Sequence, residues 1–263
     1  MKRASRVSLL TAIVLAMGCQ TVPYTGRSHL ILVSSGEEKA LGLQAYQDTL
    51  KKAKLSTDPE KLQMLRRVGH RLARAADRPD FQWEFNLIED DKTVNAWCLP
   101  GGKVAVYTGI WPVMKDEDGL AVVLGHEISH ALARHGAERM SQGALANLGG
   151  QALSVAVAGK SAGSQQVFAQ AYGLGVGLGV MLPYSRRQES EADHIGLILM
   201  AKAGYDPHKA LEFWARMDKA AGGGGKDLGL ARYLSDHPIN ADREKQIAAW
   251  IPEAMRYYKP ANP

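Results

Sequence analysis

Hydrophobic positions recur at two different spacings along the chain, and each spacing predicts a type of element. Between residues 62 and 72, leucine or valine stands at every third or fourth position, which is typical of a helix with one buried face. Asp58 followed by Pro59 predicts the start of this helix, because aspartate caps helices and proline suits the first helical position. Residues 35–38, with serine at the first position and glutamate at the fourth, form a capping box for an earlier helix running to about Lys54.

The spacing changes to two between residues 83 and 108. Trp83, Phe85 and Leu87 alternate with polar residues, as in a half-buried strand. Residues 94–99 and 103–108 are two further strand candidates, and the Pro-Gly-Gly between them favours a hairpin. From about residue 118 onward the pattern is mostly helical. Helices, a small antiparallel sheet and then more helices predict an α+β fold.

The N-terminus resembles an export signal. A basic start precedes an apolar run at 7–17, which is about half of the roughly 20 residues that span a bilayer. The run ends in Gly18-Cys19, similar to a bacterial lipobox, and this resemblance implies cleavage before Cys19 and a lipid on its sulfur. A plain signal peptide or an uncleaved anchor are the alternatives. Gln20, where aspartate would indicate inner-membrane retention, favours the bacterial outer membrane and its periplasmic face as the location of a lipid-anchored protein.

Composition and charge then exclude several classes of protein. The chain has 263 residues, of which 46% are hydrophobic and 22% charged, so it is not broadly disordered. Two cysteines cannot make a disulfide-dense scaffold. The formal net charge is +5, but Lys2, Arg3 and Arg6 lie in the signal and would leave with it, giving +2. No motif supports nucleic-acid binding.

The chemistry of the chain is concentrated at His126-Glu127-Ile128-Ser129-His130. On a helix, positions four apart share a face, so both imidazoles can bind one Zn²⁺. Glu127 is rotated by about 100° from His126 and can reach an attacking water instead of the metal. This is the H-E-x-x-H arrangement of zinc peptidases. We therefore expect one zinc per chain, with Glu127 as the general base.

A catalytic zinc needs a third protein ligand. The metzincin pattern would place glycine at 133 and histidine at 136, and the chain has Ala133 and Gly136 there, which excludes that class. Glu189 and Asp193 lie four apart on a later predicted helix. Glu189 can bind the zinc while Asp193 accepts a hydrogen bond from a ligand histidine.

These motifs, with the segment Val94 to Gly102, resemble the HtpX / Oma-type / CAAX-protease family of zinc metallopeptidases, most closely the periplasmic lipoprotein members of the Oma-type branch. The resemblance covers roughly residues 22–250. It implies a mainly helical gluzincin-type domain with Glu189 as third ligand and Asp193 behind the ligands. It also implies that an edge strand along the cleft pairs with extended substrate, through Asn95, Ala96, Trp97 and Cys98. Cys98 departs from the family's small apolar residue and is either buried and inert or sensitive to oxidation.

The resemblance also covers a histidine-proline motif near the C-terminus, here His237-Pro238. His237 is expected either to stabilise the oxyanion or to bind zinc in a self-inhibited state. Arg243, a few residues further on, is expected to bind a substrate carbonyl or to pair with Glu189 or Asp242. Residues 145–182, rich in alanine, glycine and valine, are expected to form a mobile lid. A close-packed core helix and a contact with membrane or membrane-protein substrate are the alternatives.

The domain organisation follows from these expectations. Residues 1–18 are the signal peptide, residues 19–33 a tether and residues 34–263 the peptidase domain. The predicted function is endoproteolysis of unfolded or misassembled envelope proteins in quality control, at a membrane reached through the lipid anchor. The alternative is a chaperone or assembly factor for outer-membrane proteins, with proteolysis normally off.

Overall fold

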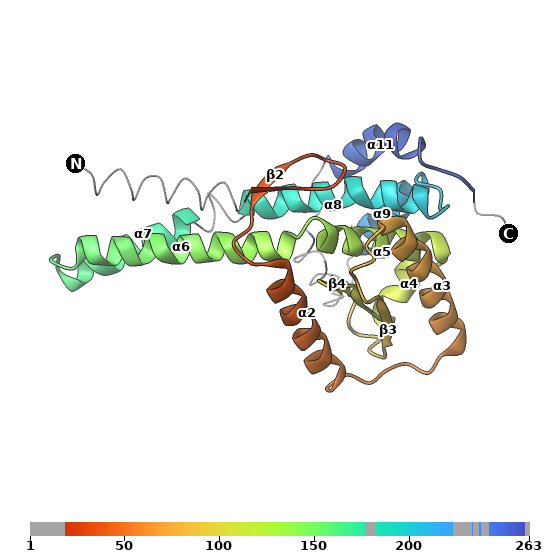
Figure 1. Ribbon diagram of the computed structural model, residues 1–263, viewed down its shortest axis with the longest axis horizontal. Coiled ribbons are helices and arrows are strands. Elements are labelled where there is room, and N and C mark those ends of the chain that lie inside the picture. The colour runs from red at the N-terminus through yellow and green to blue at the C-terminus, as the bar shows by residue number, and fades with distance from the viewer. Residues whose placement is uncertain (1–18, 177–181, 223–232, 234–236, 238–241, 261–263) are drawn as a thin grey trace. The chain divides into compact units, whose positions relative to one another are not determined.

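The computed structural model describes residues 19–176, 182–222, 233, 237 and 242–260 (Figure 1). The chain divides into two compact units, one made of residues 1–35 and 134–187 and the other of residues 36–133 and 188–263. The larger unit holds the helices and the three-stranded sheet that the sequence predicts. Its elements in chain order are α2 (Ser35–Leu50), α3 (Pro59–Ala76), β3 (Glu84–Ile88), β4 (Ala96–Leu99), β5 (Lys103–Tyr107), the 3₁₀ turn η1 (Thr108–Ile110), α4 (Trp111–Met114), α5 (Glu117–Leu132), most of α8 (Leu182–Lys202), α9 (Lys209–Gly222) and α11 (Arg243–Ala254).

Helix α3 begins where the sequence predicts. The Asp58 side chain accepts hydrogen bonds from the backbone N–H groups of Glu60 and Lys61, and Pro59 takes the first helical position. Leu65, Val68 and Leu72 are fully buried, which confirms the apolar face. Helix α2 also begins at the predicted serine but ends at Leu50, four residues before the predicted end.

The sheet is mixed, with the strand order β3-β5-β4. Strands β4 and β5 form the predicted antiparallel hairpin, and Gly101 and Gly102 both have positive φ in its turn. Strand β3 runs parallel to β5, so the prediction of a purely antiparallel sheet is wrong. Alternating hydrophobicity identifies a strand, but it does not say which neighbour the strand pairs with or in which direction.

Helix α5 is the central element of the larger unit. It packs against α3, α9 and strand β4, and almost all of its residues from Gly119 to Leu132 are buried. The Asp116 side chain caps its first turn by accepting from the N–H of Gly119. A helix that is covered on all sides by its own unit holds its side chains in fixed positions, which is what a metal site requires.

The smaller unit contains β1 (Cys19–Thr21), β2 (Ser28–Leu30), α6 (His135–Val157) and α7 (Ala162–Val176). Residues 19–33, predicted as a tether, instead form an antiparallel hairpin of β1 and β2. Val22 and Ile31 are buried, and Arg27 donates two hydrogen bonds to Glu138 at 2.6 and 2.8 Å. Burial of these apolar side chains and a buried ion pair hold the segment against α6.

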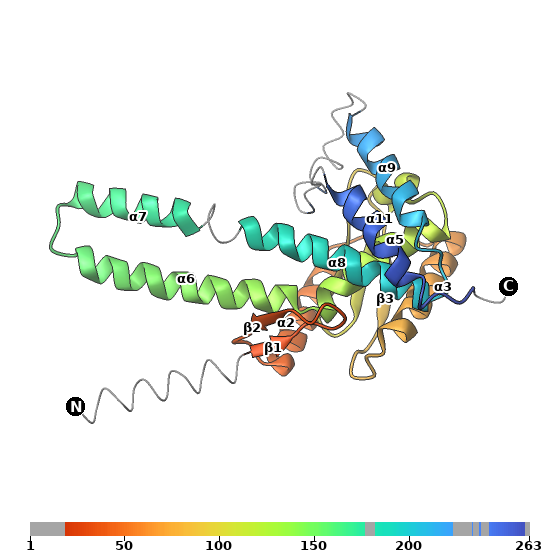
Figure 2. The same ribbon diagram turned by 90° about the horizontal axis from the view of Figure 1, so that it is seen from above.

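Helices α6 and α7 form an antiparallel helical hairpin that begins before the predicted lid segment at 145–182 and extends into it, and Figure 2 shows them side by side. Tyr172 Oη donates to the carbonyl of Ala146 across the pair. Leu148 is 60% exposed and Val155 78%, so these helices are not the close-packed core helix that was one alternative. Motion of a lid stays a prediction. Among the helices in the described part of the chain, none combines the length and the apolar character needed to cross a bilayer.

Candidate metal centre

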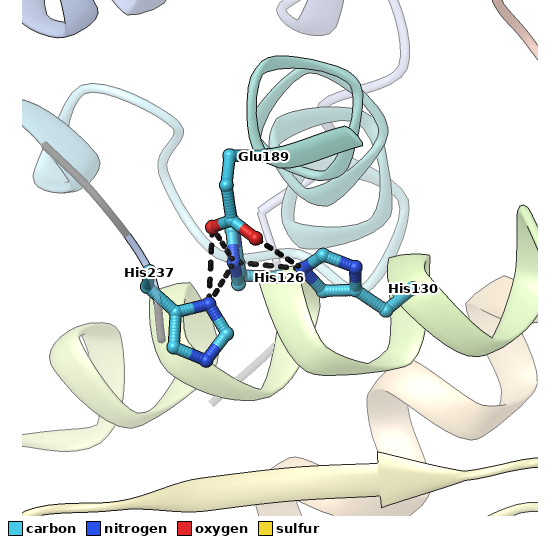
Figure 3. A group of neighbouring side chains, drawn as sticks. All are labelled: His126, His130, Glu189 and His237. Carbon is cyan, nitrogen blue, oxygen red and sulfur yellow. Dashed lines mark hydrogen bonds and ion pairs between the residues drawn. The ribbon is translucent and has the colours of Figure 1, made fainter. Parts of the chain in front are cut away.

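Helix α5 carries the two histidines of the motif on one face (Figure 3). His126 is 2% exposed, and its Nε2 lies 3.1 Å from the Nε2 of His130 one turn later. The helical repeat alone brings the two rings together, as the sequence predicts.

Helix α8 contributes Glu189, which points at both histidines (Figure 3). Its Oε2 lies 3.2 Å from His126 Nε2 and its Oε1 3.4 Å from His130 Nε2. His237 is the fourth member of the group: its Nδ1 lies 3.2 Å from His126 Nε2 and 3.0 Å from Glu189 Oε2. One ligand atom from each of the four residues lies within 4.8 Å of the others. Side chains from α5, from α8 and from position 237, which are far apart in the sequence, thus converge on one site.

The contacts of this cluster fit a cation. A neutral imidazole Nε2 offers either one N–H or one lone pair, yet His126 Nε2 meets His130, His237 and Glu189 at once. Hydrogen bonds alone cannot satisfy all these contacts. Two or three imidazole nitrogens with one carboxylate are the donor set that zinc prefers.

Asp193 lies behind His126, one helical turn after Glu189. His126 Nδ1 donates to Asp193 Oδ1 at 2.9 Å, which leaves the lone pair of Nε2 facing the other ligands. Burial on its own would lower the pKa of His126, but in the metal-free site the hydrogen bonds to Asp193 and Glu189 outweigh burial and raise this pKa to about 10, so a cation bound at Nε2 displaces a proton. Asp193 is thus placed as predicted.

Arg243, on α11, holds Asp193. Its Nε and Nη2 donate to the two carboxylate oxygens of Asp193 at 2.6 and 2.7 Å, and its guanidinium carbon lies 3.4 Å from the centre of the Trp214 ring. Burial would raise the pKa of Asp193, but the charge of Arg243 outweighs burial and lowers it. Arg243 is 2% exposed. Arg243 therefore pairs with Asp193 and not with Glu189 or Asp242, the two carboxylates predicted for it, and binding of a substrate carbonyl stays a prediction.

Glu127 lies beside the ligands and is buried. Its Oε1 has no hydrogen-bond partner among the described residues, and the imidazole Nε2 of His237 lies 3.6 Å from it. Burial raises the pKa of Glu127, and the neighbouring His237 opposes this shift. A carboxylate with a raised pKa and a free oxygen is equipped to take a proton.

Two features of the site escaped the sequence analysis. A Cβ on Gly196 would lie 3.1 Å from the backbone of Gly125 and His126, so α5 and α8 cross with glycine against glycine next to the first ligand. Tyr233 is buried, and its ring lies 4.7 Å from the His237 ring, while its carbonyl accepts from the N–H of His237 at 2.8 Å. The glycine next to His126 in an apolar helix was the available signal, because glycine is costly there unless packing requires it.

Strand β4 is an edge strand of the sheet as described, as predicted, with β5 on one side. Ala96 and Cys98 are buried and Trp97 is half-exposed, with its ring 5.9 Å from that of Tyr46, and Asn95 lies just before the strand. Burial raises the pKa of the Cys98 thiol well above its usual range, which favours the inert interpretation. Pairing of substrate with this edge stays a prediction.

The remaining candidates are not at this centre. Cys19 is exposed at the start of β1, and its lipidation stays a prediction, since residues 1–18 lie outside the described part. Of the histidines, His194 pairs with Glu253 and His208 with Asp206. Among the described residues, the group on α5 and α8 with His237 is the one cluster suited to a metal.

Two histidines four apart on a buried helix, a glutamate between them and a third ligand on a later helix define a gluzincin-type zinc metallopeptidase. Residues 59–251 match the family model described as "Peptidase family M48", and the chain belongs to this family. The resemblance to Oma-type zinc metallopeptidases, the mainly helical fold and the zinc metalloendopeptidase activity are confirmed.

The chain is similar to named relatives along most of its length. It is 39% identical over 238 residues to the "Mitochondrial metalloendopeptidase OMA1" of Schizosaccharomyces pombe, covering 89% of this chain and 67% of the relative. To the human "Metalloendopeptidase OMA1, mitochondrial" it is 29% identical over 267 residues, covering 98% and 51%. To the "Beta-barrel assembly-enhancing protease" of Escherichia coli it is 28% identical over 233 residues, covering 85% and 44%.

These comparisons correct the predicted location. The relatives matching over the greatest part of their own length are named as mitochondrial enzymes, whereas the prediction placed the chain at a bacterial outer membrane, on the periplasmic face. That prediction depended on the export-signal pattern ending in Gly18-Cys19, on Gln20 and on the resemblance to periplasmic lipoproteins, and it is contradicted.

Proposed function

We propose that this metallopeptidase cuts unfolded or misassembled proteins within their chains, as a quality-control protease. The observation that carries the proposal is the buried Glu127, with an oxygen that has no hydrogen-bond partner among the described residues, beside four converging ligand atoms. A site built only to hold a structural metal has no use for such a group, because burying an unpartnered carboxylate oxygen is costly.

The residues of the site have separate roles in peptide hydrolysis. His126, His130 and Glu189 would hold zinc, which when bound polarises the scissile carbonyl and lowers the pKa of the attacking water. Glu127 takes a proton from that water on its free oxygen and passes it to the leaving amine. Asp193 keeps His126 in the tautomer whose Nε2 lone pair faces the ligand cluster.

His237 supports a resting state in which the site is closed. Its Nδ1 lies as near to His126 and Glu189 as those ligands lie to each other. A fourth protein ligand completes a tetrahedral zinc site, whereas a catalytic site keeps one position open. We therefore propose His237 as an inhibitory ligand that withdraws when substrate binds. This arrangement also gives specific support to the alternative function, a chaperone whose proteolysis is normally off.

Replacing Glu127 with glutamine tests the proteolytic function. We expect zinc content by mass spectrometry to match wild type and hydrolysis of an unfolded protein to fall about 10²–10⁴-fold, the usual contribution of a general base. Glu117→Gln is the matched control, since this residue lies on the same helix and pairs with Arg67. Unchanged hydrolysis in Glu127→Gln with zinc bound would rule out the assigned base. Equal suppression of aggregation by wild type and Glu127→Gln would favour the chaperone.

The role of His237 is tested separately with His237→Ala. A rise in hydrolysis, with zinc still bound, supports the inhibitory ligand. A fall with zinc still bound contradicts it and assigns His237 to the oxyanion. His194→Ala is the control, because that ring pairs with Glu253 and stacks on Trp250 away from the ligands.

A further inference from the structure

The α6–α7 hairpin contains almost no charge. Lys160 is the one charged residue between Arg139 and Arg186, in a chain that is 22% charged overall, and it lies in the turn between the two helices. Helices exposed to water normally carry charged residues on their exposed face. The composition of this hairpin is therefore unusual for a water-exposed element.

The hairpin nevertheless buries little of its surface. From residue 142 to residue 173, no side chain for which exposure is described is buried. Leu145, Leu148, Val155 and Val167 are each between 46% and 78% exposed. Contiguous exposed apolar surface of this kind marks an interaction site.

An apolar stripe and an uncharged groove lie on opposite sides of α6. Leu145, Leu148, Ala152 and Val155 recur at intervals of three and four, which makes one apolar stripe along the helix. A groove of about 820 Å³ runs between α6 and α7, and its lining mixes uncharged polar side chains such as Asn147 and Ser154 with apolar ones such as Leu153 and Val157. By the helical repeat, these four residues of the lining lie on the side of α6 away from the stripe. The polar groups on the groove side are thus uncharged, and the outer side of α6 carries the apolar stripe.

We propose that the apolar stripe of α6 lies against the hydrocarbon of a lipid bilayer, with the hairpin held at the membrane interface. A bilayer excludes charged side chains but accepts an apolar helix face, which matches the stripe. Within the described residues of α6 and α7, neither helix is long and apolar enough to span a bilayer, so we place the hairpin in the interface.

The charges that border the hairpin fit lipid headgroups. Lys160, Arg186 and Arg187 are exposed, and no acidic residue occurs between Glu138 and Glu189. Basic side chains at the ends of an apolar segment reach the phosphates of the interface. This arrangement of charge is complementary to a membrane surface and distinguishes it from the mixed charged rim of a protein interface.

A position-specific fluorescence measurement tests the proposal. A polarity-sensitive dye is attached to the full chain carrying Cys19→Ser and either Val155→Cys, on the stripe, or Ser154→Cys, in the groove. Cys98 is buried and does not compete for the dye. Vesicles of phosphatidylcholine and phosphatidylglycerol should raise emission at 155 several-fold, and spin-labelled acyl chains should quench it. Emission at 154 should change little.

Introduction of a negative charge on the stripe is the second arm. Leu148→Asp in the Val155→Cys chain should weaken vesicle binding of the dye-labelled region at least tenfold, whereas Asn147→Asp, which adds the same charge to the groove, should not. No lipid-dependent change at 155, or equal changes at 155 and 154, would overturn the proposal. So would an emission rise that follows protein concentration without lipid, which would assign the stripe to a second copy. A rise on adding an unfolded protein without vesicles would assign it to substrate.

Discussion

Removal of the Arg243 side chain is the sharpest test of how the folded chain supports its metal site. The guanidinium makes two hydrogen bonds of 2.6 and 2.7 Å to Asp193, and the two residues are 2% and 6% exposed. Breaking a buried pair by removing one partner costs about 3–5 kcal/mol, because the other charge is left uncompensated. For a chain of this size, that loss in the free energy of unfolding corresponds to about 6–20 °C in melting temperature.

The same substitution should weaken zinc binding. Asp193 orients His126, and loss of such a supporting partner costs about 10–100-fold in metal affinity. We expect Arg243→Ala to lose affinity by this factor, measured by competition with a chelator well below the melting temperature. Arg243→Lys keeps the charge but not the two-pronged geometry, and it should lie between Arg243→Ala and wild type.

A double substitution separates stability from positioning. Arg243→Met with Asp193→Leu removes both charges and fills the space, so the free energy of unfolding of the metal-free protein should recover most of the loss. Zinc affinity should not recover, since nothing then orients His126. Wild-type zinc affinity in Arg243→Ala, or recovery of zinc affinity in the double variant, would refute the positioning role.

Three further predictions follow from the local geometry. Gly196→Val should lower zinc affinity in a chelator competition and destabilise the fold by about 1–3 kcal/mol, because the side chain meets the backbone at Gly125; unchanged affinity would contradict the close helix crossing. Asp58→Ala should cost about 1 kcal/mol in denaturant unfolding, and Asp58→Asn, which can still cap α3, should cost less. Cys98 should react with a thiol reagent only after unfolding, because burial raises its pKa, and fast reaction in the native protein would show an accessible thiol.

Local chemistry accounts for the parts of the fold that the sequence predicted correctly. The cap at Asp58 and the buried positions on α3 depend on residues close together in the chain. The spacing of His126 and His130 makes the two rings meet by helical geometry alone. The hairpin of β4 and β5 follows from its glycines, which accept positive φ.

Predictions about contacts between residues far apart in the sequence were less accurate than those about local structure. Nothing local indicates that β3 runs parallel to β5, or that Arg243 pairs with Asp193 and not with its sequence neighbour Asp242. The predicted tether also proved to be a hairpin, because the buried partner of Arg27 is Glu138, more than a hundred residues away. Which strands or charged side chains pair depends on their burial and geometry in the folded chain, and the sequence pattern around each residue does not contain this information.

The sequence by itself determined the chemistry of this protein. Two histidines and a glutamate on one helix, followed by Glu189 and Asp193 four apart on another, specify a zinc peptidase because side-chain type and helical spacing decide which groups can bind metal. Only the tertiary structure decided how the ligands meet and what holds them. It crosses α5 and α8 at two glycines, brings His237 beside His126, His130 and Glu189, and places Arg243 behind Asp193. Those contacts arise from packing, which joins residues that the chain keeps far apart.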